Sequence, residues 1–131
     1  MASIFSRIIN GEIPCYKIAE NDDFLAFLDI TPVEKGHTLV VPKKEVDYIF
    51  DMEDEDLAKL HLFAKRVAKA VKKAVPCLRI GVAVIGLEVP HTHVHLVPLH
   101  NTGSLSFTKE RIKMTNDEFL SLSTTINTHF V

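Results

Sequence analysis

The stretch VPHTHVHLVPLH, residues 89–100, contains four of the seven histidines in this 131-residue chain. His91, His93 and His95 occupy alternate positions within it. In a β-strand, successive side chains point to opposite faces and each residue advances the chain by about 3.3 Å. We therefore predict a strand that ends near Pro98, with neighbouring imidazoles roughly 7 Å apart on its outward or cleft-facing side. The other face is expected to point into the core and carries Thr92, Val94 and Leu96.

The segments before this strand predict a short helix and three further strands. Apolar residues recur at helical spacing within residues 4–9, which predicts an N-terminal helix. Residues 16–19 and 23–30 are typical of two strands around a polar turn, and this pattern favours an antiparallel hairpin. Residues 37–42 predict a third strand that ends in a proline.

One long helix is predicted from Glu53 to Val75. Its apolar residues recur at three- and four-residue steps, while acidic residues crowd its start and lysines lie near its end, as the helix dipole favours. Residues 78–85 then predict another strand, and residues 117–128 predict a weaker helix capped by Asn116. Few helices and strands that mostly follow one another in the chain indicate the α+β class with an antiparallel sheet.

The composition is that of an ordinary globular protein. Hydrophobic residues make up 47% and charged residues 24%, so we expect a single domain over residues 1–131. The net charge of −2 gives no electrostatic argument for nucleic acid or an acidic membrane as a partner. No apolar stretch approaches a membrane span and the N-terminus does not resemble a signal peptide. Cys15 and Cys77 are then expected as reduced thiols, and the protein as cytoplasmic.

Three uses of the histidine row are open on the residues alone. Three imidazoles and a water can form a catalytic zinc shell, but ligands on one straight strand form a line and do not converge. A purely structural network requires a hydrogen-bond partner for every buried ring nitrogen. In a third use, one neutral imidazole attacks phosphorus or a carbonyl while its second nitrogen donates to a fixed acceptor. A row of imidazoles fits this third use better than it fits a metal cage.

The residues also resemble a known family. HTHVHLV, residues 91–97, resembles the signature of the histidine triad family, in which His-x-His-x-His precedes two apolar residues. SIFSRIINGEIP (3–14), AFLDITPVEKGHTLVVPKK (26–44) and GLEVPHTHVHLVP (86–98) follow that family's order and approximate spacing. The resemblance covers about residues 3–100 and leaves 101–131 as a tail. It implies the HIT-like fold, a five-stranded antiparallel sheet with one long helix and short flanking helices.

The same resemblance implies an enzyme that hydrolyses or transfers nucleotides at the α-phosphate through a covalent nucleotidyl-histidine. By this likeness His93 is the nucleophile, His95 contacts the phosphate, and His91 and His37 belong to the supporting network. The expected substrates are nucleoside phosphoramidates or related nucleotide conjugates, with a purine preferred, and the chemistry requires no metal or cofactor. Dinucleoside polyphosphate hydrolysis is the alternative within the class.

The resemblance also implies a nucleoside pocket and a homodimer whose sheets join edge to edge. Asp29 corresponds to the acceptor for the ribose hydroxyls, a role that suits a carboxylate, although it also fits an ordinary turn acid. The base-pocket positions, each of which also fits a core residue, are Ile4, Phe5, Ile8, Ile13, Phe27 and Ile30.

Three departures from the family pattern affect these expectations. Zinc-binding relatives carry Cys-x-x-Cys where this chain has Ser3 and Ser6, so we expect no structural zinc. Leu87 and Glu88 replace a Gln-Ser or Gln-Thr pair, and an asparagine common upstream is missing from GVAVIG. Glu88 would repel phosphate if ionised and donate to it if protonated. It therefore favours a second class of function, a nucleotide-binding regulatory module with weak turnover.

Overall fold

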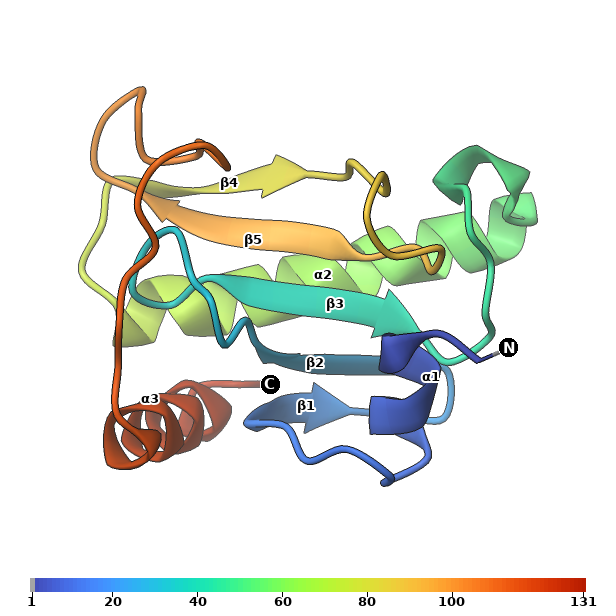
Figure 1. The fold of residues 1–131 in the computed structure, drawn as a ribbon, viewed down its shortest axis with the longest axis horizontal. Helices are drawn as coiled ribbons and strands as arrows, with labels where there is room; N and C mark the ends of the chain where they lie inside the picture. Colours follow the sequence, from blue (N-terminus) through green and yellow to red (C-terminus); the bar gives the residue numbers. More distant parts are fainter. Residues whose placement is uncertain (1) are drawn as a thin grey trace.

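The computed structural model describes residues 2–131 and contains one five-stranded antiparallel sheet with strand order β1-β2-β3-β5-β4 (Figure 1). The strands are β1 Lys17–Glu20, β2 Phe24–Leu28, β3 Thr38–Pro42, β4 Arg79–Ala83 and β5 Val94–Leu99. The helices are α1 Ile4–Ile9, the 3₁₀-helix η1 Ile49–Asp51, α2 Asp54–Ala74 and α3 Asn116–Thr128. The predicted α+β class, five-stranded sheet, long helix and short flanking helices are confirmed.

The two faces of the sheet are covered by different helices. In Figure 1, α2 crosses behind the sheet and α1 lies in front of it. On β2, Ala26 and Leu28 belong to the larger core, which α2 and α3 cover, whereas Leu25 and Phe27 belong to a smaller cluster with Phe5 of α1. All residues of β2 and β3 are buried because both of their faces are covered.

Helix α2 supplies most of the larger core. Its stripe of apolar residues is buried against the sheet, and its acidic first turn and basic last turn complement the helix dipole. Its bounds lie one residue inside the predicted range at both ends, with Glu53 and Val75 as the flanking caps. The buried residues of α2 are Leu60, Phe63, Ala64, Val67, Ala70 and Val71.

The histidine strand differs from the prediction in where it begins. β5 starts at Val94, so His91 and His93 precede the strand, and only His95 lies within it. The row is also buried rather than outward, with 0%, 7% and 8% of each residue exposed in chain order. The sequence pattern missed this because α1 and the tail cover that face, which alternation along a strand cannot reveal. Val94 and Leu96 do enter the core as predicted.

The C-terminal helix begins one residue earlier than predicted and has a different cap. Thr115, not Asn116, is the N-cap, and its hydroxyl accepts a hydrogen bond from the Glu118 backbone at 3.1 Å. The Glu118 side chain accepts in return from the Thr115 N–H at 2.9 Å, which completes a capping box. α3 then packs against α2 and β1. No helix among residues 2–131 has both the length and the apolar character that a bilayer crossing requires.

The loop between β2 and β3 is held in place by close packing. Gly36 has a φ of +95°, and a Cβ added there would lie 2.9 Å from Val75 Cγ2 and 3.1 Å from Pro98 Cγ. Glycine is therefore required both by the backbone conformation and by the close approach. The tail pairs with the same loop, since the Ile112 N–H donates to the Pro32 carbonyl at 2.8 Å. These contacts fix the segment that carries Asp29 and His37.

Candidate functional site

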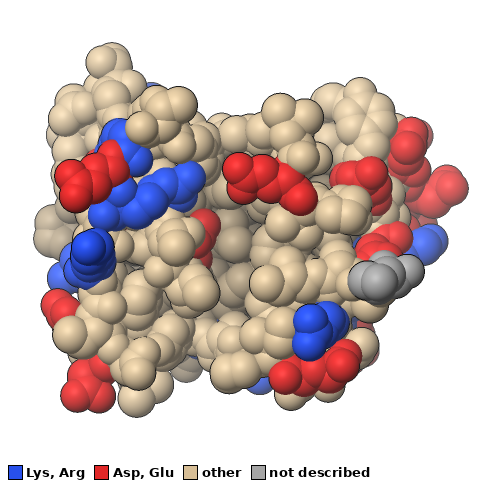
Figure 2. Space-filling model, in the orientation of Figure 1, with Lys and Arg blue, Asp and Glu red and all other residues tan. Residues whose placement is uncertain are grey.

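Four imidazoles meet on the face of the sheet that α1 partly covers. His37 immediately precedes β3, and its ring centroid lies 5.2 Å from that of His95. The His93 and His95 centroids are 4.8 Å apart at a tilt of 65°. Figure 2 shows this face, which is hollowed and carries a group of Lys and Arg side chains over the segment that follows β5. The structure thus brings together all four histidines singled out from the sequence.

His37 and His95 form a directed hydrogen-bond pair. The Val33 N–H donates to His37 Nδ1 at 3.1 Å, so this nitrogen carries a lone pair and the ring hydrogen lies on Nε2. His37 Nε2 is 2.9 Å from His95 Nδ1 and therefore donates to it. His95 in turn carries its hydrogen on Nε2. The pair thus leaves an N–H donor on Nε2 of His95. Its direction is set by two successive hydrogen bonds, from the Val33 amide to His37 and from His37 to His95.

His93 has the opposite arrangement. Its Nδ1 lies 2.8 Å from the backbone carbonyl oxygen of His91, and a carbonyl oxygen can only accept. The ring hydrogen of His93 is therefore on Nδ1, and Nε2 carries the lone pair. The Phe5 ring contacts the His93 ring edge to face at 4.8 Å between centroids. The site consequently places a free nitrogen lone pair on the His93 ring, beside the His95 ring, which carries an N–H donor.

Burial disfavours the charged form of three of these imidazoles, those of His37, His91 and His95. Desolvation lowers the pKa of His37 to about 4, against the opposing attraction of Asp29, and lowers the pKa of His95 to about 3. Desolvation also lowers the pKa of His91, although its hydrogen bond to the Pro42 carbonyl opposes this. Neutral His37 and His95 rings at physiological pH preserve the direction of the hydrogen bond between them, because a protonated ring donates from both nitrogens.

Asp29 lies beside the His37–His95 pair. Its Oδ1 accepts from the Thr31 N–H at 2.8 Å and from the Thr31 hydroxyl at 3.1 Å, while Oδ2 is 3.6 Å from His37 Nε2. One carboxylate oxygen is thus held by the turn, as an ordinary turn acid would be, and the other faces the site. Asp29, His37 and His95 also bring three possible metal-ligand atoms within 4.8 Å of one another. A metal ion there would displace the His37–His95 hydrogen bond.

The other residues predicted to line a substrate pocket differ in how deeply they are buried. Phe5 and Phe27 pack together with a centroid distance of 5.8 Å beside the histidines, and Ile8 lies at the edge of the same cluster. Ile13 is half-buried. The exposed members are Ile4 and Ile30, which are not core residues, and Glu88 in the loop before the histidines.

Two residues of the tail join the site and were missed from the sequence. The Phe107 ring contacts the His95 ring at 4.7 Å between centroids and the His37 ring at 6.0 Å. Arg111 stacks over Phe107 at 5.6 Å and donates to the Thr31 carbonyl at 2.7 Å. The tail has no regular secondary structure here, so no periodicity signals these contacts. An aromatic residue closely followed by cations was the available hint.

The N-terminal serines do not fit a zinc site. Ser3 Oγ lies 2.7 Å from His91 Nδ1, and Ser6 Oγ donates to Glu45 Oε1 at 2.8 Å. Hydroxyl oxygens are not among the usual zinc ligands, which are thiolates, imidazoles and carboxylates. These hydroxyls are also already hydrogen-bonded. Glu45 is a third residue that the sequence pattern does not reveal, since it lies 42 positions from Ser3 in the chain.

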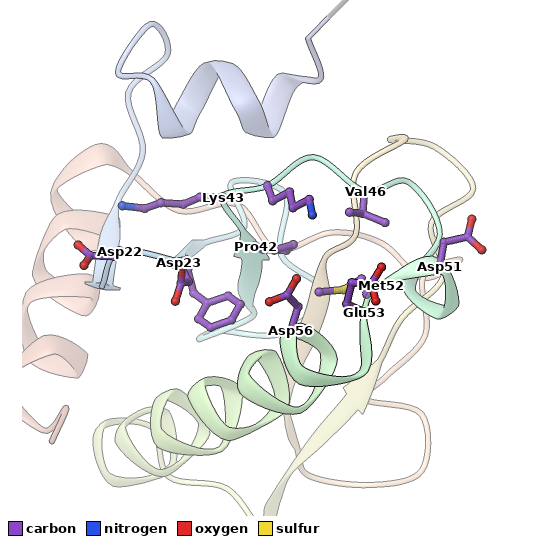
Figure 3. Close-up of a pocket in the computed structure, with 11 residues that line it drawn as sticks. Asp22, Asp23, Pro42, Lys43, Val46, Asp51, Met52, Glu53 and Asp56 are labelled. Atoms are coloured by element: carbon purple, nitrogen blue, oxygen red, sulfur yellow. The ribbon is translucent and has the colours of Figure 1, made fainter.

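A cavity of about 590 Å³ lies elsewhere, between the start of α2 and the ends of β2 and β3 (Figure 3). None of the four site histidines lines it. Its walls include Phe24, Pro42 and Met52 together with acidic residues of the α2 N-terminus, which complement the helix dipole. The cavity is therefore separate from the histidine rings, although two of its lining residues, Pro42 and Val46, accept hydrogen bonds from the histidine segment.

Comparison with known proteins agrees with this fold. A family model described as HIT domain matches residues 10–102. The chain is 33% identical over 132 residues to an uncharacterized HIT-like protein of Borreliella burgdorferi, with 95% of each chain covered. It is 38% identical over 102 residues to an adenosine 5′-monophosphoramidase of Schizosaccharomyces pombe, with 77% of each covered. A crystal structure of a Hit-like protein involved in cell-cycle regulation from Bartonella henselae has a TM-score of 0.85 and 31% identity, covering 98% of this chain and 96% of that one.

The lowered pKa values predict how stability depends on pH. An unfolded histidine binds its proton near pH 6.5, whereas folded His37 and His95 bind theirs near 4 and 3. Between these limits the unfolded chain holds more protons, so the free energy of unfolding falls as the pH drops below about 6.5. In His95→Gln, which retains an oxygen acceptor for His37, the decline should be smaller. Urea unfolding of both proteins between pH 7.5 and 4.5 measures the difference, and equal declines would contradict these protonation states.

Proposed function

The chain belongs to the HIT domain family, and we propose that it hydrolyses nucleoside 5′-phosphoramidates or related nucleotide conjugates at the α-phosphate. The observation that carries this proposal is the pairing of a lone pair on His93 Nε2 with an N–H donor on His95 Nε2. The similarity to an adenosine 5′-monophosphoramidase supports the same class of substrate and favours adenosine as the nucleoside. No step in the reaction below requires a metal or a cofactor.

In the first step, the Nε2 lone pair of His93 attacks the α-phosphorus and forms a nitrogen–phosphorus bond. The bond from phosphorus to the leaving amine breaks, its electron pair leaves with the amine, and the amine takes up a proton from water. The His91 carbonyl accepts the Nδ1 hydrogen of His93 at 2.8 Å and stabilises the positive charge that develops on the ring. The N–H of His95 donates to a non-bridging phosphate oxygen.

In the second step, water attacks the phosphorus of the nucleotidyl-His93 and loses a proton, which neutralises the hydroxide left when water protonated the amine. The bond to Nε2 breaks, the electron pair returns to the ring, and the products are the nucleoside monophosphate and the regenerated imidazole. Splitting one displacement into two easier ones is the advantage of a covalent intermediate. Since the His93 ring is held by its other nitrogen throughout, it returns to the same tautomer for the next turnover.

The nucleoside is expected to lie between Asp29 and the aromatic cluster formed by Phe5 of α1 and Phe27 of β2. The Oδ2 atom of Asp29 is available as an acceptor for the ribose hydroxyls, since Oδ1 already accepts from Thr31. Phe5 and Phe27 supply apolar surface for a base next to His93. Exposed Glu88 lies in the loop expected near the leaving group and favours the alternative of a nucleotide-binding module with slow turnover.

The His93→Ala variant separates catalysis from binding. We expect hydrolysis of adenosine 5′-phosphoramidate to fall by at least about 10³-fold, because the nucleophile is lost. AMP should still bind, because the contacts expected from Asp29, His95 and the aromatic cluster remain. Coupled spectrophotometric assay and titration calorimetry measure the two quantities, and His61→Ala, an exposed position on α2, is the matched control.

Full activity in His93→Ala would disprove the assignment of the nucleophile. A wild-type protein that binds AMP but does not turn over at saturating substrate would instead favour the regulatory module. A panel that includes dinucleoside polyphosphates, assayed without added metal, tests the alternative within the class.

We also propose that two copies of the chain join through β4. Among residues 2–131, this strand is at one edge of the sheet and pairs only with β5. It carries the exposed apolar residue Val82, and exposed Leu78 and Ile85 flank it, with 60%, 72% and 48% of each residue accessible. An edge strand with apolar side chains favours pairing with a second edge, and two-fold symmetry closes such an interface.

The Val82→Lys variant tests this dimer. We expect the wild-type protein to have twice the 14.7 kDa mass of the chain. The variant should have the mass of one chain, because each copy would bring a positively charged lysine to the shared edge and the like charges would repel. Light scattering coupled to size exclusion measures both. Leu120→Lys, at a similarly exposed apolar residue on α3, should remain dimeric. A monomeric wild type at micromolar concentration would contradict the proposal.

A further inference from the structure

We propose that Ser3 and Glu45 are positioning residues that hold the His91 ring in the tautomer set by the Pro42 carbonyl and, through the His91 carbonyl, fix the orientation of His93. The expected effect of these residues on turnover rests on the proposed function, whereas their hydrogen bonding to His91 does not. Neither residue touches the expected position of the phosphate. They act from the side of His91 that faces α1, opposite the β3 carbonyl that holds the same ring.

The two ring nitrogens of His91 have different partners. Nε2 lies 2.8 Å from the Pro42 carbonyl oxygen, which can only accept, so Nε2 carries the hydrogen. A neutral ring then has its lone pair on Nδ1, which lies 2.7 Å from Ser3 Oγ. The Ser3 hydroxyl must therefore donate. In the opposite tautomer, the lone pair on His91 Nε2 would face a lone pair of the Pro42 carbonyl oxygen. Water could not relieve this repulsion, because His91 is fully buried.

The Ser3 hydroxyl is oriented by its role as the cap of α1. Its oxygen accepts from the Ser6 N–H at 3.0 Å, which engages a lone pair and leaves the hydroxyl hydrogen directed at His91. One hydroxyl thus starts the helix and donates to the imidazole. A methyl group in its place would leave His91 Nδ1 without its closest donor in a buried environment, where an unsatisfied acceptor is costly.

Glu45 selects Ser3 as the donor. Its Oε1 accepts from the Ser3 N–H at 2.7 Å and from the Ser6 hydroxyl at 2.8 Å. Ser6 Oγ is also 3.4 Å from His91 Nδ1, but its single hydrogen is committed to Glu45. The backbone hydrogen bond from Ser3 lowers the pKa of Glu45 to about 2, so the acceptor is a carboxylate at physiological pH. Glu45 thereby fastens the start of α1 to the segment after β3.

This network reaches His93 by two routes. The carbonyl of His91 accepts from His93 Nδ1 at 2.8 Å, so the position of the His91 residue sets the direction of the His93 lone pair. Phe5 of α1 contacts both rings, with centroid distances of 5.8 Å to His91 and 4.8 Å to His93. Loosening α1 would therefore release two restraints on the nucleophile together. Small errors in the placement of a reacting group reduce rate far more than they reduce binding.

Nitrogen NMR of the histidine rings reads the tautomer directly. In the wild type we expect His91 with its hydrogen on Nε2 and His93 with its hydrogen on Nδ1. In Ser3→Ala the His91 Nδ1 resonance should move toward that of an unbonded lone pair and the His93 Nδ1 resonance should shift. In Ser3→Thr, which keeps a hydroxyl, both should stay close to wild type. Ser121→Ala, an exposed serine on α3, is the matched control.

Kinetics with adenosine 5′-phosphoramidate provide the second measurement. For Ser3→Ala we expect kcat to fall about tenfold or more with KM nearly unchanged, since orientation rather than binding is lost. Ser3→Thr should restore kcat. Glu45→Leu should reduce kcat less than Ser3→Ala does, because the Ser6 hydroxyl becomes an alternative donor. A loss confined to KM, or no rescue by threonine, would contradict positioning.

Two outcomes keep this proposal distinguishable from the proposed function. If the wild type shows no turnover, the proposed function fails, and the positioning proposal is decided by the ring resonances of Ser3→Ala alone. If the wild-type His91 ring carries its hydrogen on Nδ1, the positioning proposal is wrong whatever the activity. If Ser3→Ala does not fold, as judged by circular dichroism, the His93 Nδ1 resonance of Glu45→Leu decides it, because that substitution frees the start of α1, and an unchanged resonance overturns the proposal.

Discussion

The hydrogen bond from His93 Nδ1 to the His91 carbonyl is the contact on which the site depends. It places the lone pair of His93 on Nε2, and no other protonation of a neutral ring is compatible with that acceptor. The adjacent pair of His37 and His95 has the reverse polarity, because the Val33 amide donates to His37 and starts a chain of donors. Two opposite hydrogen-bond directions on neighbouring rings thus place an available nitrogen lone pair beside a ring N–H donor.

These directions persist because the sheet is covered on both faces. α2 and α3 bury one face, and on the other α1 and the tail leave the histidines with 8% exposure or less. The resulting desolvation keeps the rings of His37 and His95 neutral well below physiological pH. Within residues 2–131 every buried side-chain nitrogen and oxygen has a hydrogen-bond partner, so the buried network incurs no cost from unsatisfied groups. The burial of His37 and His95 therefore determines which of their ring nitrogens can donate a hydrogen bond.

Much of the fold was predictable from local patterns. The antiparallel sheet and α2 follow from apolar periodicity, and the four histidines from alternation and resemblance. Local patterns failed where tertiary contacts decide. The strand begins at Val94 because His91 and His93 turn toward α1. The cap of α3 is different, because Thr115 and Glu118 form a capping box, a local Thr-x-x-Glu pattern that the sequence itself contains. Glu45, Phe107 and Arg111 reach the site from irregular segments and across long sequence separations, which one sequence does not encode in any period. The roles of the site residues and the single-domain boundaries stay predictions.

The central claim is that His93 forms a covalent bond to the substrate phosphorus. Mass spectrometry of protein quenched with acid-free denaturant during turnover of adenosine 5′-phosphoramidate tests it most directly. The account predicts a mass increase of one adenylyl group that peptide sequencing locates on His93 and that is absent when substrate is omitted. Steady turnover with no adduct on that residue at any quench time, together with a stoichiometric metal ion in the active protein, would contradict it.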